Sequence, residues 1–424
     1  MFLLVDGNNF YVSCERLYRP DLNNKPVVVL SNNDGCIVAR SNEVKALGIK
    51  MGEPLFKCKH IIDRYRVTVF SSNYALYADL SNRIVTILKR FTPDIEVYSI
   101  DESFLVINMC SGSYYELGRT IKETVLQEVG IPVGVGIGKT KTLAKVANKL
   151  AKTTPEGVFN IHEYDENKLL RTVPVSDLWG IGKGFTKRLS SILIHNAYQF
   201  KIAAPALIRK RLHVWGERMQ LELQGISCMP LEVATKPNKS IISSKSFGKK
   251  ITDCHLLEGA IAANVIKATE KCRKQQLKVK EITVFLISDR FRDQHYYHAM
   301  DIQLPTYSSA TGYVTYFVIN AIKKLYRCGV VYTKSGVICN NLCHEQQVQT
   351  ELRLQPTTIS DAMSHFSQDK LDKAMKAYDA INQKWGSGKI ELATTQVKDK
   401  PWKMNQQQKS KHLTTQWCSI LKVK

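Results

Sequence analysis

The chain has 424 residues, of which 44% are hydrophobic, so it is long enough for several domains and too apolar to be disordered throughout. No run of about 18 apolar residues occurs, so no membrane-spanning helix is expected. Lys and Arg number 60 against 38 Asp and Glu, and the net charge of +22 indicates a polyanionic partner, with nucleic acid expected before an anionic membrane surface.

The first 152 residues alternate short apolar runs with amphipathic stretches. The apolar run at 1–5 meets Asp6 at once and lacks a basic leading region, so it predicts a strand and not a signal peptide. The periodicity predicts strands at 2–6, 26–30, 95–100, 103–107 and 132–137, and helices at 10–17, 42–47, 74–91, 117–129 and 139–152. This order is the split βαβ pattern of a ferredoxin-like sheet, with an insertion after the first strand.

The rest of the chain predicts a helical stretch and then a second mixed region. Residues 171–236 are expected to be helical, and the polar, proline-containing stretch 235–240 indicates a linker. A small α/β sandwich follows, with strands expected at 241–247, 281–287 and 336–342 and helices at 256–276 and 311–328. Beyond about residue 345 the composition shifts to Gln, Lys and Thr, which predicts one helix at 368–384 and a loosely ordered tail.

Three carboxylates come together in this predicted topology. Asp6 ends the first strand, and Asp101 and Glu102 lie at the tip of the predicted hairpin, which a ferredoxin-like sheet places beside that strand end. Phosphoryl transfer to a 3′-hydroxyl uses two divalent ions about 3.5–4 Å apart, and magnesium prefers oxygen ligands. We therefore predict that Asp6, Asp101 and Glu102 are catalytic, metal-binding residues; ordinary exposed turn residues are the alternative.

Two glycine-rich segments invite comparison with phosphate-binding loops. Residues 134–140 resemble a P-loop, but Val133 stands where the first glycine is required, so an ATPase is not expected. Gly180 and Gly182 predict the tight turn of a helix-hairpin-helix, whose backbone N–H groups bind a DNA phosphate without reading sequence. Lys183 and Lys187 follow on the second helix and are expected to help; a plain helix–helix turn is the alternative.

The motifs around the carboxylates resemble those of a known enzyme family. Residues 6–11, DGNNFY, and 98–103, YSIDES, are similar to the two signature motifs of Y-family DNA polymerases. Residues 28–36, VVLSNNDGC, are similar to one branch of it, the UmuC-like catalytic subunits of bacterial DNA polymerase V and their plasmid-borne relatives. The resemblance covers essentially the whole chain, through further motifs at 70–74, 179–182, 244–248 and 414–417.

The resemblance implies an α+β, multidomain, right-hand polymerase. Its expected parts are a ferredoxin-like palm at 1–10 and 75–165, small fingers at 11–74, a helical thumb with the helix-hairpin-helix at 166–236, an α/β little finger at 240–344, and a partner-binding C-terminal tail at 345–424.

The resemblance also implies contacts with the incoming nucleotide. Tyr11 matches a steric gate, an aromatic ring under the sugar that excludes a 2′-hydroxyl, although helix packing is the alternative. Lys152 matches a lysine that reaches the triphosphate, and Lys45 lies where the family often places a basic residue against the phosphates. The nucleotide-binding residues expected are Gly7, Phe10, Tyr11, Asn42, Lys45 and Lys152, with Arg40 as a further candidate, and the Gly7 carbonyl is also expected beside the metal ligands. In the little finger, Lys245 and Lys249 are expected to hold DNA, unless they belong to a solvated basic face.

The implied function is error-prone, template-directed translesion synthesis in the SOS response, with deoxynucleotides and primer-template DNA as substrates and two Mg²⁺ ions, or Mn²⁺, as cofactors. A two-metal nuclease and a non-catalytic DNA-binding scaffold are the alternatives. The resemblance implies a processed UmuD-type dimer and RecA as partners. The nearest candidate for a sliding-clamp peptide is 349–354, where Arg353 replaces the expected aromatic residue. The 11 scattered cysteines are typical of reduced thiols in the cytoplasm, and the cluster of Cys339, Cys343 and His344 lacks the second ligand pair of a zinc site.

Overall fold

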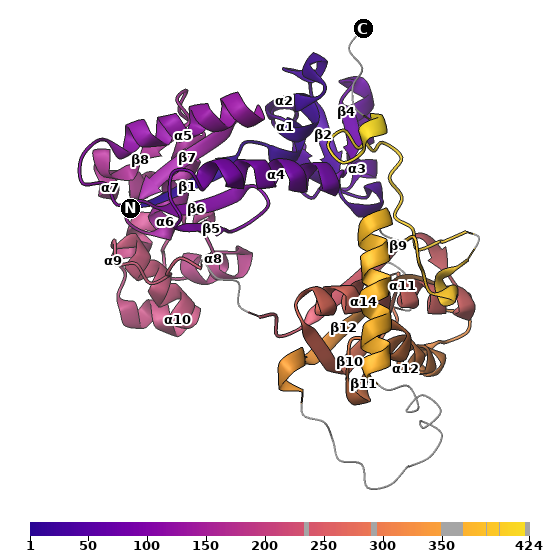
Figure 1. Cartoon of the computed structure of the whole chain (residues 1–424). Coiled ribbons are helices and arrows are strands. Elements are labelled where there is room, and N and C mark those ends of the chain that lie inside the picture. The colour runs from indigo at the N-terminus through magenta and orange to yellow at the C-terminus, as the bar shows by residue number, and fades with distance from the viewer. Residues whose placement is uncertain (233–236, 290–294, 349–367, 387, 398, 420–424) are drawn as a thin grey trace. The chain divides into compact units, whose positions relative to one another are not determined.

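The chain divides into two compact units in the computed structural model, which describes residues 1–232, 237–289, 295–348, 368–386, 388–397 and 399–419 (Figure 1). Unit 1 comprises Met1–Thr235 together with Gln407–Lys424, and unit 2 comprises Lys236–Gln406. Unit 1 is therefore discontinuous in sequence. Within the described residues, no helix is both long enough and apolar enough to span a membrane.

Unit 1 is organised around a five-stranded sheet. Its order is β5-β6-β1-β7-β8, and the first four of these strands follow the predicted ferredoxin-like arrangement. The strands are β1 (Phe2–Gly7), β5 (Ile95–Val97), β6 (Glu102–Val106), β7 (Val133–Gly138) and β8 (Val158–Asn160). β1 lies antiparallel to both β6 and β7, so it occupies the centre of the sheet.

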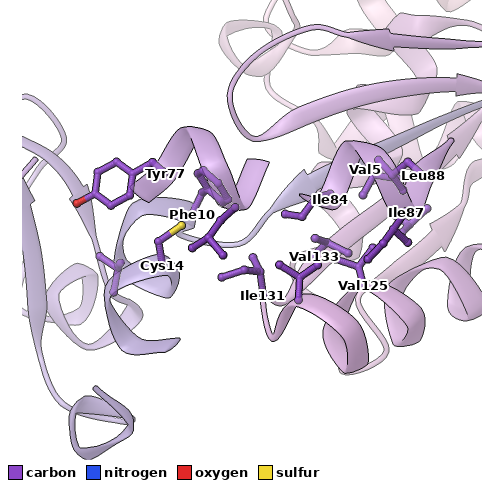
Figure 2. Close-up of a cluster of buried hydrophobic side chains, with 14 of the residues drawn as sticks. Val5, Phe10, Cys14, Tyr77, Ile84, Ile87, Leu88, Val125, Ile131 and Val133 are labelled. Atoms are coloured by element: carbon purple, nitrogen blue, oxygen red, sulfur yellow. The ribbon is translucent and has the colours of Figure 1, made fainter. Parts of the chain in front are cut away.

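Side chains of β1 alternate between the two faces of this sheet. Leu3 and Val5 join a core with α4 (Tyr74–Leu88) and α5 (Tyr114–Val129), part of which Figure 2 shows. Leu4 packs on the opposite face with residues of β6 and α6 (Lys141–Ala151). Successive strand residues point to opposite faces, so Asp6 shares the α6 face with Leu4.

Helix α6 lies directly on β7. A Cβ atom on Gly136 would stand 2.1 Å from the backbone nitrogen of Asn148 and 2.3 Å from the carbonyl oxygen of Ala144. Only a residue without a side chain permits this approach. The glycines that superficially resemble a P-loop therefore have a packing role, because they bring the basic helix α6 close to the end of β1.

The insertion after β1 forms its own small sheet with the order β3-β2-β4. It contains α1 (Phe10–Leu17), β2 (Val27–Leu30), β3 (Ile37–Arg40), α2 (Asn42–Ala46), α3 (Leu55–Arg64) and β4 (Thr68–Ser71), and it has a separate hydrophobic core. Of these elements, β3, α3 and β4 were not predicted. Residues 166–223 contain α7 (Glu166–Thr172), α8 (Lys183–Ser190), α9 (Ala197–Ile202) and α10 (Pro205–Leu223) around a third core, so the helical stretch predicted at 171–236 ends earlier, at Leu223.

Unit 2 is an α/β sandwich with a four-stranded antiparallel sheet of order β11-β10-β12-β9. The elements are β9 (Ile241–Ile251), α11 (Cys254–Lys274), β10 (Leu277–Ser288), β11 (Tyr297–Ser308), α12 (Thr311–Leu325), β12 (Tyr332–His344) and α14 (Gln368–Trp385). The expected strands and helices are present, but the edge strand β11 was missed. Trp402, far along the tail, packs into this core with 4% of its surface exposed.

Candidate active site and nucleic-acid interface

Strand pairing places two of the predicted catalytic carboxylates opposite each other. The register of β1 and β6 pairs Asp6 with Glu102, and directly opposed residues of antiparallel strands point to the same face. The third carboxylate lies at the adjoining turn, where the Gly7 N–H donates to the Asp101 carbonyl at 2.8 Å. The Ser99 hydroxyl donates to the Asp101 carboxylate at 2.6 Å and accepts the Glu102 N–H, which orders this turn.

The three carboxylates interact electrostatically. Asp6 is only 8% exposed, and burial, as the largest cause, raises its pKa to about 6. The ammonium group of Lys152 lowers this pKa, whereas the negative charges of Glu102 and Asp101 raise it further. A carboxylate whose charge is opposed by burial and by two like charges is stabilised by any cation that enters.

Two lysines provide that positive charge, Lys145 on α6 and Lys152 at the C-cap of that helix. Lys152 Nζ lies 2.8 Å from Asp6 Oδ1, and Lys145 Nζ lies 2.8 Å from Glu102 Oε1. In the part of the chain that the structure describes, no three His, Cys, Asp or Glu side chains are gathered closely enough to form a ready-made metal site. The donors are nevertheless oxygen atoms next to shared negative charge, and this donor set suits Mg²⁺ or Mn²⁺.

A second feature is a group of cations in front of Asp6. The pKa of Lys45 is lowered, first by burial and then by the positive charges of Arg40 and Lys152, while Asp6 raises it. Asn42 Oδ1 accepts hydrogen bonds from Lys45 Nζ at 3.2 Å and from Asn9 Nδ2 at 3.0 Å. Lys45, with two cations that repel it and a carboxylate that attracts it, forms a place where a polyphosphate is electrostatically favoured.

The predicted gate residue lies on the first turn of α1. Tyr11 stacks on Tyr77 with ring centroids 4.4 Å apart and an interplanar angle of 16°, and Tyr74 meets it edge-on at 6.2 Å. Phe10, predicted to bind nucleotide, is 3% exposed in the hydrophobic core, and that burial favours a packing role for its side chain. A Cβ on Gly7 would stand 2.9 Å from the Phe10 ring, so Gly7 permits the tight turn into α1.

Lys145 is a site residue that sequence reasoning did not single out. Besides its contact with Glu102, its Nζ lies 4.5 Å from the ring centroid of Tyr98 and 5.3 Å from that of Trp179. Trp179 Nε1 also donates to the Tyr98 hydroxyl at 3.1 Å. The available signal was the seven-residue spacing between Lys145 and Lys152, which puts both on one face of a helix.

The tight turn of the predicted helix-hairpin-helix is present before α8. Gly180 has φ of +81°, and a Cβ there would meet Trp215 Nε1 at 2.6 Å. Gly182 is the N-cap of α8, and Lys183 and Lys187 are exposed. The element before the turn is a 3₁₀ turn at Val175–Asp177 and not a full helix. DNA binding by this turn stays a prediction.

The basic residues predicted in unit 2 differ in exposure. Lys249 is exposed on β9, whereas Lys245 on the same strand is partly covered. Burial, followed by the positive charges of Lys267 and Lys400, lowers the pKa of Lys245. The candidate clamp peptide at 349–354 lies outside the described residues.

Known protein families match most of the chain. The model of the impB/mucB/samB family matches residues 5–149, the model of that family's C-terminal domain matches 238–352, and a domain of unknown function matches 372–423. Protein UmuC of Salmonella typhimurium is 36% identical over 100% of both chains. A DNA polymerase IV of Dehalococcoides mccartyi is 28% identical over 66% of this chain and 72% of its own.

The fold is also similar to solved structures. A Y-family DNA polymerase chimera built from Dbh and Dpo4 superposes with a TM-score of 0.64, covering 80% of this chain and 98% of its own. The two sequences are 23% identical, so this likeness concerns the fold. The α+β architecture inferred from the sequence is thereby confirmed.

Proposed function

Because the chain belongs to the impB/mucB/samB family, we propose that it is a template-directed, error-prone DNA polymerase that performs translesion synthesis. The observation that carries this proposal is the pairing of Asp6 with Glu102, together with the positive charges of Lys45, Arg40 and Lys152 that act near Asp6. The carboxylates suit metal ions, and the cations suit a triphosphate. A two-metal nuclease needs the carboxylates, but its reaction uses neither cations that bind a triphosphate nor an aromatic ring at the sugar position.

Each part of the site has a definite task in this proposal. Asp6, Asp101 and Glu102 would hold two Mg²⁺ ions, or Mn²⁺, which supply activation of the primer 3′-hydroxyl and neutralisation of triphosphate charge. Lys152 exchanges its contact with Asp6 for a phosphate oxygen, and Lys45 holds the same triphosphate. Tyr11 packs beneath the sugar and leaves no space for a 2′-hydroxyl.

The remaining parts of the chain hold DNA and partners. Residues 1–10 and 75–165 act as palm, 11–74 as fingers and 166–236 as thumb, and residues 240–344 act as little finger. The turn at Gly180 and Gly182 with Lys183 and Lys187, and separately Lys245 and Lys249, bind DNA backbones. A UmuD-type processed dimer and RecA are the proposed partners in the cytoplasm, and residues 345–424 are the proposed region for such contacts.

Primer extension across an abasic template site tests the activity. We expect Mg²⁺-dependent extension by the wild-type chain, with the proposed partners added, and loss of at least about 10³-fold in rate for Asp101→Ala, because the developing charge loses a metal ligand. Asp94→Ala is the matched control, since it removes an exposed carboxylate of the same hairpin.

Two results would contradict the proposal. Equal rates of extension by the wild type and by Asp101→Ala would show that Asp101 has no role in the reaction. Release of short products from DNA without added nucleotides, abolished by Asp101→Ala, would favour the nuclease.

A further inference from the structure

The C-terminal segment 408–411 lies against the edge of the small sheet in unit 1, where Figure 1 shows the yellow chain beside β4. The Ser71 N–H donates to the Gln408 carbonyl at 3.0 Å, and the Gln408 N–H donates to Ser71 Oγ at 2.9 Å. Ser71 and Lys409 form a parallel bridge. The segment thus closes the free edge of the β3-β2-β4 sheet at Ser71.

The same segment is joined to the start of α4. Asn73 is fully buried and is the N-cap residue of that helix. Its Nδ2 donates to Ser410 Oγ at 2.9 Å and also lies within hydrogen-bond distance of the carbonyls of Ser410 and Lys411, at 3.4 and 3.3 Å. The donor group of this buried amide is therefore committed to the C-terminal segment.

A buried carboxylate on α1 continues this connection. Glu15 is 2% exposed, and its Oε1 accepts hydrogen bonds from Ser410 Oγ at 3.1 Å and from the Tyr77 hydroxyl at 2.7 Å. Burial raises the pKa of Glu15, and these two hydrogen bonds lower it. Removing a donor from a buried carboxylate is costly, so the position of Glu15 depends on Ser410.

The connection ends at the predicted gate. Tyr77, which is fully buried, stacks on Tyr11, and Figure 2 shows its hydroxyl directed away from the aliphatic side chains of the core. Tyr74 meets both rings edge-on, at 6.2 Å from Tyr11 and 6.3 Å from Tyr77. The C-terminal segment therefore contacts both helices that present these rings, through Glu15 on α1 and through Asn73 at the start of α4.

We propose that segment 408–411 sets sugar selectivity, because Ser410, acting through Glu15 and Tyr77, holds the Tyr11 ring where it excludes a 2′-hydroxyl. Ser410, Glu15 and Tyr77 are positioning residues, since they act through Tyr11. The inference rests on the proposed polymerase function and on Tyr11 as its gate. It assigns a task to segment 408–411, which lies within the match to a domain of unknown function at residues 372–423.

The test is single-nucleotide extension by the full-length chain with a deoxynucleotide and with the matching ribonucleotide. The readout is the ratio of the two kcat/KM values. Ser410→Ala and, separately, Tyr77→Phe are expected to lower this ratio about 5-fold, the equivalent of about one hydrogen bond, while kcat/KM for the deoxynucleotide changes less than about 2-fold. Ser410→Thr keeps the hydroxyl and is expected to restore the ratio. Gln408→Ala is the matched control, because Gln408 is exposed and is bonded to Ser71 through its backbone.

Tyr11→Ala separates failure of this inference from failure of the proposed function. If Tyr11→Ala lowers the ratio and the Ser410 and Tyr77 variants do not, the C-terminal segment has no role in selectivity. Equal losses with both nucleotides would indicate a purely structural role and would also overturn the inference. If the wild type does not extend a primer, or if Tyr11→Ala leaves the ratio unchanged, the proposed function or its gate fails and the inference falls with it.

Discussion

At the scale of single residues, the site depends on charged groups whose charged forms are disfavoured by burial and by neighbouring like charges. Burial and the positive charges of Arg40 and Lys152 disfavour the charge of Lys45, and burial and the negative charges of Glu102 and Asp101 disfavour that of Asp6, which Lys152 only partly offsets. Each group is poised for a partner of opposite sign. Substitutions at these positions should therefore change ligand binding without lowering the stability of the fold.

Lys45→Ala is expected to raise KM for the deoxynucleotide about 10-fold and to leave the melting temperature unchanged. The variant removes one charge-assisted contact to phosphate, and it also relieves the repulsion from Arg40 and Lys152. Steady-state extension with increasing nucleotide measures KM. Lys50→Ala, an exposed lysine nearby, is the control, and an unchanged KM for Lys45→Ala would remove Lys45 from the nucleotide site.

The raised pKa of Asp6 predicts how the metal requirement depends on pH. Metal and proton compete for the same carboxylate, and with a pKa of about 6 the proton is mostly absent near pH 7.5 and mostly present near pH 5.5. The Mg²⁺ concentration for half-maximal extension should therefore rise about 4-fold over this range as the pH falls. A requirement that does not depend on pH would show that Asp6 is not a ligand.

At the scale of elements, the strand and helix pattern around the carboxylates could be predicted because each element has a clear apolar period. β11 was missed because it is an edge strand with mixed exposure, which hides the alternation of its side chains. β3 and β4 are four residues each and end in a polar residue, whereas the equally short β2 is an unbroken apolar run and could be predicted. The position of Asp6 beside the hairpin could be predicted from the order of the strands alone. The aromatic rings around Lys145 could not be predicted, because they come from segments that are brought together only in the folded chain.

The close approach of α6 to β7 predicts a large effect at Gly136. The Cβ of Gly136→Ala would overlap backbone atoms of α6, which cannot move away as a side chain can. We expect about 3 kcal/mol of destabilisation and a melting temperature lower by roughly 6–12 °C. Gly184→Ala is the control, because nothing lies within 4 Å of its Cβ. Equal melting temperatures for the two variants would contradict this account of the packing.

At the scale of the whole molecule, the net charge of +22 governs association with DNA. Affinity for primer–template should fall steeply as salt rises, and replacing both Lys183 and Lys187 with Ala should lower the slope of log affinity against log salt by about two. Binding measured by fluorescence anisotropy over a salt series checks this. Replacing Lys323 and Lys324, exposed on α12, is the control, and an identical slope for the Lys183 and Lys187 variant would leave the turn before α8 without a DNA contact.

The return of the chain to unit 1 after unit 2 has a consequence for synthesis on the ribosome. Residues 408–411 are made after all of unit 2, yet they pair with the end of β4 at Ser71 and supply hydrogen-bond partners for Asn73 and Glu15. Domains generally fold as they emerge, N-terminal first, so the small sheet forms early with an unpaired edge. A chain cut short before residue 407 would keep its carboxylates but leave that edge open at Ser71, so closure of the small sheet waits until residues 408–411 have been translated.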